Sequence, residues 1–164
     1  TSCMEGIPIP VKINLLNRQR VLALHPRAFR RLVRTLVRRA FPADAAPPFD
    51  ELTVLLTDDA GMPSYKARCF GVPAQTDVVA QAYVAMPGCR LPTAEIILNA
   101  ERARLEGRPR PGGCARELAL YLAHGLDHLA GRRDVTPVGR RAMRRLESAW
   151  LDADPAAWKG IVGP

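Results

Sequence analysis

Two histidines on one predicted helix are the residues most able to carry chemistry in this chain. His124 and His128 lie four residues apart in the stretch LAHGLDHLAGRRDVT, residues 122–136. A spacing of four places both imidazoles on one face of an α-helix, about one turn apart, where they can bind one metal ion together. The same spacing also fits an ordinary amphipathic helix without a metal.

A glycine and an aspartate after the pair favour the metal. Gly131 can end the helix in the left-handed conformation and let the chain turn back, which would bring Asp134 toward the imidazoles. Two nitrogen ligands and one oxygen ligand leave a position open for water or substrate, as in catalytic zinc sites. We therefore predict a metal site formed by His124, His128 and Asp134.

The length and composition predict a single domain over residues 1–164 with an irregular start over 1–10. The chain is 48% hydrophobic, and a chain of this size buries a real core. We expect a cytoplasmic protein that does not enter a membrane, because no apolar run approaches the roughly 20 residues of a span and the first residues do not resemble a signal peptide. The four cysteines form no C-x-x-C pair and are expected to be reduced thiols: Cys3, Cys69, Cys89 and Cys114.

A strong positive charge predicts a polyanionic partner. The formal net charge is +8, and 21 of the 24 basic residues are arginine, which forms bidentate contacts with phosphate. A basic but inert surface is the alternative, and clustering argues against it. Nucleic acid is the natural partner, and the arginines that we expect to contact it are Arg34 and Arg38 on one predicted helix and Arg132, Arg133, Arg140 and Arg141 after the histidine pair.

Hydrophobic periodicity predicts an α+β domain with a small, mainly parallel or mixed sheet of about four strands and about five helices. The strands are expected at 11–16, 51–57, 77–84 and 94–98, and the helices at 26–40, 63–69, from 99 through 106, at 115–130 and from 137 to about 150. In the last helix we expect Val138, Ala142, Met143, Leu146 and Trp150 to face inward, with Thr136 as the N-cap.

The histidine stretch resembles a known family signature. Residues 124–134, HGLDHLAGRRD, are similar to the H-G-x-L-H-L-x-G-x-D-H motif of the YbeY family, bacterial metal-dependent endoribonucleases of rRNA maturation. Residues 76–79, TDVV, resemble that family's T-D-V-L strand, and residues 94–97, AEII, stand where the family has G-D-I-V. The resemblance extends from about residue 52 to residue 151.

The resemblance implies a fold, a cofactor and partners. It implies a single α+β domain whose metal helix ends in a glycine turn, with one divalent metal, usually zinc, between sheet and helices. The metal would activate water for attack on an RNA phosphodiester. His124 would act in catalysis as a ligand. The implied partners are single-stranded rRNA precursors, the small ribosomal subunit and its assembly factors. The oligomeric state is left open.

Four positions depart from the family pattern. Asp134 replaces the third histidine, and because a carboxylate is a harder ligand, manganese or another transition metal becomes an alternative to zinc. Arg133 replaces an aspartate. The family's arginine before T-D-V aligns with Phe70, and Arg68, two residues away, is our candidate for its catalytic role. Asp127 replaces a leucine, and we expect it at the surface in an ion pair with Arg132 or Arg133.

Two other functions compete with the nuclease. A zinc peptidase shares the ligand spacing, but such enzymes carry a glutamate directly after the first histidine as general base, and here that position is Gly125. A non-catalytic factor that binds RNA or the ribosome, with a structural metal or none, would need only the arginines.

Overall fold

Four strands form one mixed sheet that carries the rest of the fold. The structure is a computed structural model that describes residues 10–83, 87–88 and 92–164. The strands are β1 (Lys12–Asn17), β2 (Glu51–Thr57), β3 (Val78–Tyr83) and β4 (Thr93–Asn99), in the spatial order β1-β2-β4-β3. β2 pairs in parallel with both β1 and β4, and β3 pairs antiparallel with β4. The predicted mixed sheet is thereby confirmed.

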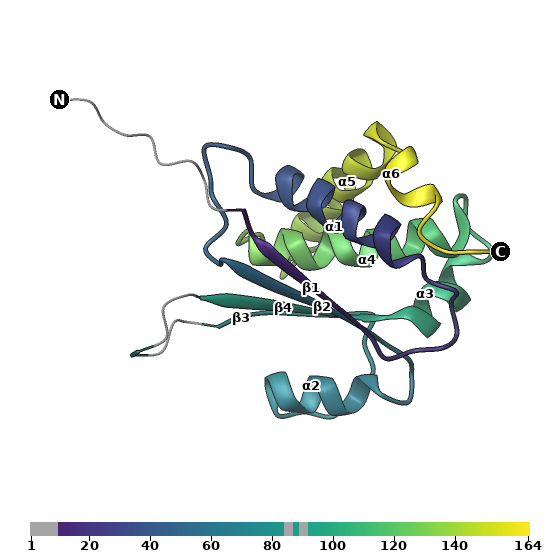
Figure 1. Cartoon of the computed structure of the whole chain (residues 1–164), viewed down its shortest axis with the longest axis horizontal. Coiled ribbons are helices and arrows are strands. Elements are labelled where there is room, and N and C mark those ends of the chain that lie inside the picture. The colour runs from purple at the N-terminus through teal and green to yellow at the C-terminus, as the bar shows by residue number, and fades with distance from the viewer. Residues whose placement is uncertain (1–9, 84–86, 89–91) are drawn as a thin grey trace.

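Helices cover both faces of the sheet unequally. They are α1 (Pro26–Ala40), α2 (Met62–Phe70), α3 (Ala100–Gly107), α4 (Gly113–Leu129), α5 (Pro137–Ala153) and the short α6 (Ala156–Lys159). Figure 1 shows α1, α4, α5 and α6 on one side of the sheet and α2 on the other. The described residues thus hold the five helices expected from the sequence and one more turn, which confirms the α+β fold.

The helix predicted over residues 26–40 is present as α1 and is amphipathic. Its buried residues are Phe29, Leu32, Val33, Leu36, Val37 and Ala40, which recur at helical spacing. They join the inward side chains of β1, β2 and β4 in the main hydrophobic core. Five arginines of α1 face solvent, whereas the half-buried Arg30 donates to the carbonyl of Ile13 on β1. The helix is therefore held mainly by packing on its apolar stripe.

The predicted inward face of α5 is partly wrong. Met143 and Trp150 are buried, but Val138 is 68% exposed and Ala142 is exposed too. The buried face instead includes Glu147 and Leu151. The buried face of α5 is therefore not purely apolar. The contact of Glu147 with His124 on α4 also determines which face of the helix turns inward.

A glycine lets α4 lie very close to the sheet. A Cβ atom added at Gly125 would lie 3.0 Å from Ile96 Cγ2 on β4 and 3.3 Å from Val78 Cγ2 on β3. On either side of it along the helix, Leu118, Leu122 and Leu126 are completely buried. This contact sets the height and rotation of the helix that carries both histidines.

Cys69 and Cys114 are free thiols, as expected, whereas Cys3, Cys89, residues 1–9 and Val84 lie outside the described residues. In the described ranges, every helix is too short or too polar to cross a membrane.

We predict that Gly125→Val lowers the free energy of unfolding by roughly 1–3 kcal/mol, because overpacking a dense core costs about that much. Urea denaturation followed by circular dichroism measures it. Gly160→Val is the matched control, since Gly160 has a φ of −100° and open space where a Cβ would project. A Gly125→Val protein as stable as the wild type would show that α4 is not held this closely.

Candidate metal centre

Three polar side chains converge at the C-terminal end of α4. His124 Nε2 lies 3.0 Å from His128 Nε2, and Asp134 Oδ2 lies 3.7 Å from His124 Nε2 and 3.8 Å from His128 Nε2. All three side chains are partly exposed, so water or a substrate can reach them. The structure therefore brings together the three predicted ligands.

The separations suit a small divalent cation. Four tetrahedral ligands that are about 2.0–2.1 Å from zinc are roughly 3.3–3.5 Å from one another. The three measured separations lie on both sides of that range. Two nitrogen donors and a carboxylate oxygen also suit zinc or manganese, so the residues present fit a metal of this class.

The chain reaches Asp134 through a glycine turn of the predicted kind. Gly131 has a φ of +95°, and its N–H donates to the carbonyl of His128. The N–H of Arg132 donates to the carbonyl of Asp127. Together these two hydrogen bonds form a Schellman motif, which ends the helix and reverses the chain toward the imidazoles.

The imidazole of His124 is held from behind by a buried acid. His124 Nδ1 lies 2.7 Å from Glu147 Oε1, and the Glu147 side chain is only 3% exposed. Burial lowers the pKa of His124, but the hydrogen bond and the charge of Glu147 outweigh it and raise the pKa above its ordinary value. Burial also raises the pKa of Glu147, with a further contribution from the carboxyl of Asp127.

Asp127 occupies a buried position, and the expectation of a surface residue is wrong. Its ion pair with Arg132 is present, with Arg132 Nη1 2.7 Å from Asp127 Oδ1, but the Asp127 side chain is fully buried. It is buried because it stands on the inward side of the last turn of α4, beside Glu147 of α5. The pair connects the glycine turn to the acid behind His124.

A pocket of about 820 Å³ opens beside the three converging side chains. The loop before β3, α3, α4 and α5 all contribute to it. Residues that line it are Gln75, Thr76, Asp77, Arg102, Glu106, Arg110, Glu117, Leu120, Tyr121, His124, Asp134, Arg140, Arg144 and Glu147. The predicted site thus lies on the wall of a cavity large enough for part of a polymer, and the TDV segment singled out in the sequence contributes to its lining.

The arginines of this pocket differ in their electrostatic partners. Arg102 is close to Asp59 and Glu106, and Arg110 pairs with Glu106 and Glu117. In the part of the chain that the structure describes, Arg140 and Arg144 form no ion pair with a carboxylate. Arg140 donates only to the backbone carbonyl of Asp134, at 3.1 Å. These two guanidinium groups therefore remain available to an anion.

The other arginines predicted to contact RNA lie outside the pocket lining. Arg133 and Arg141 are exposed, and Arg132 donates to Asp127. Arg34 and Arg38 are exposed on α1.

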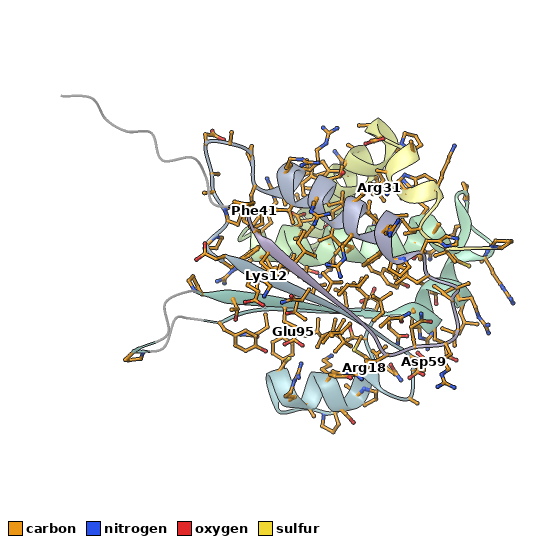
Figure 2. The ribbon with its side chains drawn as sticks, in the orientation of Figure 1. Lys12, Arg18, Arg31, Phe41, Asp59 and Glu95 are labelled. Carbon is orange, nitrogen blue, oxygen red and sulfur yellow. The ribbon has the colours of Figure 1, made fainter. Side chains whose placement is uncertain are left out.

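Arg68 lies away from the histidine pair. It extends from α2 to form an ion pair with Glu95 and lies over the Tyr65 ring. Figure 2 shows Glu95 on the side of the sheet that α2 covers, whereas α4 covers the opposite side. The structure therefore does not bring Arg68 together with the predicted ligands.

Glu147 is the site residue that the sequence analysis missed. A signal was present, because Glu147 falls on the stripe that contains Met143 and Trp150, where an acid interrupts an apolar face. A charged residue is almost never fully buried unless it is paired. Its partner, His124, could not be identified without the crossing of α4 and α5.

Comparison with known proteins gives a consistent result. The sequence profile described as "Endoribonuclease YbeY" matches residues 14–153. Proteins named endoribonuclease YbeY from Chelativorans sp. and Anaeromyxobacter dehalogenans are 33% and 32% identical; the matches cover 74% and 88% of this chain and 79% and 72% of those proteins. Another from Anaeromyxobacter sp. strain Fw109-5 is 30% identical over 69% of this chain, but only 56% of its own length is covered.

A solved structure supports the fold independently. The solution structure of a protein from Thermotoga maritima has a TM-score of 0.57 at 16% identity, with 90% of this chain and 91% of that chain covered. The profile match over most of the chain, the two relatives above 30% identity and the shared signature at His124 lead to one conclusion. The chain belongs to the endoribonuclease YbeY family.

Proposed function

We propose that this protein is a metal-dependent endoribonuclease that acts in rRNA processing and ribosome maturation. The observation that carries the proposal is the convergence of His124, His128 and Asp134 beside a pocket. His124 and Asp134 line that pocket together with Arg140 and Arg144. A site for a divalent cation beside two available guanidinium groups suits a phosphodiester substrate. Family membership supplies the substrate class.

The site residues have two proposed roles, as metal ligands and as phosphate-binding groups. His124, His128 and Asp134 would hold the ion, most readily zinc, with manganese or another transition metal as the alternative. A divalent ion so held supplies an activated water near neutral pH and stabilises charge on a phosphate. Arg140 and Arg144 would bind phosphates that flank the scissile bond. Water then adds across a P–O bond of the RNA, and the chain is cut into two.

Partners follow from the family and from the charge. We propose single-stranded regions of rRNA precursors as the substrate, with the small ribosomal subunit and its assembly factors as the setting. The exposed arginines on α1 and those after the glycine turn offer additional contacts for such a polyanion. A cytoplasmic location would fit these partners. The proposal gives Arg68 no role at the metal, since its guanidinium is paired with Glu95.

We predict that His128→Ala abolishes both metal binding and RNA cleavage while leaving the fold intact, because a partly exposed imidazole contributes a ligand but little core. Metal content after reconstitution with Zn²⁺ or Mn²⁺, cleavage of a structured rRNA fragment and circular dichroism measure the three properties. His25→Ala is the control, since His25 is exposed at the start of α1.

Unchanged metal content in His128→Ala would contradict the ligand assignment. Another outcome would distinguish a non-catalytic RNA-binding factor from a nuclease. If the wild type binds the RNA fragment with defined metals but never cleaves it, and His124→Ala binds equally well, the protein is a non-catalytic RNA-binding factor.

We also predict that the double variant Arg140→Ala/Arg144→Ala weakens RNA binding and lowers the slope of log affinity against log salt by about 1 to 2, since each lost phosphate contact on a single strand removes about 0.7. Its metal content should match the wild type. Filter binding over a salt series measures this. Arg34→Ala/Arg38→Ala removes the same charge from α1, and an equal or larger effect there would place the main RNA contact on α1 instead.

A further inference from the structure

We infer that Glu147 is a positioning residue that selects which nitrogen of His124 faces the metal. It would do so by accepting the hydrogen of Nδ1, which leaves the lone pair of Nε2 directed toward His128 and Asp134. The inference rests on the proposed function, because it presupposes a metal at this point. It adds a residue from a different helix to the ligand set.

The geometry gives the two nitrogens of His124 opposite tasks. Nδ1 lies 2.7 Å from Glu147 Oε1, while Nε2 lies 3.0 Å from His128 Nε2 and 3.7 Å from Asp134 Oδ2. A neutral imidazole has one N–H and one lone pair, and an ionised carboxylate can only accept. The hydrogen must therefore be on Nδ1 for the Glu147 bond, and Nε2 is the nitrogen left to bind a cation.

Burial makes this contact effective. The Glu147 side chain is 3% exposed and that of His124 is 28% exposed, so little water competes for the hydrogen bond. A hydrogen bond in such surroundings is electrostatically stronger than in water. An acceptor of this kind behind a ligand imidazole fixes the ring orientation and makes the other nitrogen a better donor to the metal.

Glu147 has a second buried acid as its neighbour. The carboxyl of Asp127 on α4 lies near it, and Arg132 in the glycine turn pairs with Asp127. Met143 and Trp150 are buried on the same face of α5. The position of the Glu147 carboxylate is therefore fixed by packing on this face as well as by its hydrogen bond with His124.

The two histidines differ in this respect. Among the described residues, no carboxylate bonds to Nδ1 of His128, whose polar side-chain contacts all use Nε2. Loss of Glu147 should thus disturb His124 selectively. His128 then becomes an internal reference within the same protein.

The first experiment measures tautomers by ¹⁵N NMR of the histidine rings in the full, metal-free chain, at a pH above the imidazole pKa values. In the wild type, His124 should carry its hydrogen on Nδ1. In Glu147→Leu, which removes the acceptor at similar volume, His124 should shift toward the Nε2–H form, while His128 stays unchanged. Glu147→Gln keeps an acceptor oxygen and should retain the wild-type tautomer.

The second experiment measures Zn²⁺ affinity by competition with a chromogenic chelator. Loss of such a partner costs about 10- to 100-fold in affinity, which we expect for Glu147→Leu, with Glu147→Gln between it and the wild type. Glu117→Gln is the matched control, because Glu117 is also buried but is paired with Arg110 instead of a histidine. Its Zn²⁺ affinity should equal that of the wild type.

The outcomes separate the inference from the proposed function. If the wild type binds neither Zn²⁺ nor Mn²⁺, the proposed function fails, and the tautomer measurement still tests the contact of Glu147. If the wild type binds Zn²⁺ and Glu147→Leu binds it equally well with His124 still protonated on Nδ1, the inference is overturned. A Glu147→Leu protein that does not fold leaves the decision to Glu147→Gln, whose affinity must then fall below that of Glu117→Gln.

Discussion

The close approach of α4 to the sheet is the constraint on which the rest of the site depends. Gly125 stands between His124 and His128 in the sequence, and its missing side chain lets the helix lie directly against Ile96 and Val78. The direction of every side chain on α4 follows from that contact, because a helix has a fixed angular relation between neighbouring positions. Gly125, which stands where a zinc peptidase carries its glutamate base, thus also determines where the two imidazoles lie.

Helix α5 supplies both kinds of polar group that the site needs. Its middle carries the buried Glu147, and its first half carries Arg140 and Arg144 on the pocket wall. These arginines are near the N-terminus of a 17-residue helix that has no acid in its first turn. Cations there oppose the helix dipole, which costs some stability, but their charge adds to the positive potential of that end. Such an arrangement favours an anion in the pocket.

The sequence predicted local structure well and three-dimensional relations only in part. Apolar spacing located α1, and the His-Gly-Asp pattern located the converging ligands because only one helical turn and the glycine turn separate them in the sequence. The order of the strands and the crossing of α4 and α5 depend on distant contacts, which periodicity does not encode. For that reason Glu147 was missed and Asp127 was expected at the surface. Arg68 was a candidate for a catalytic role, and the structure pairs it with Glu95 instead of bringing it to the histidines. Each of these three cases concerns a polar side chain whose partner lies on another element or in a turn.

The carboxylate of Asp134 changes the electrostatics of the proposed centre as well as its metal preference. Compared with three neutral imidazoles, two imidazoles and one carboxylate lower the net charge around the ion by one. The centre then attracts a phosphate less strongly, because the interaction follows the net charge. Arg140 lies next to Asp134, since it donates to the backbone carbonyl of that residue at 3.1 Å. With Arg144 it restores positive charge on the open side of the pocket. In this chain, therefore, more of the affinity for phosphate should come from α5 and less from the ion.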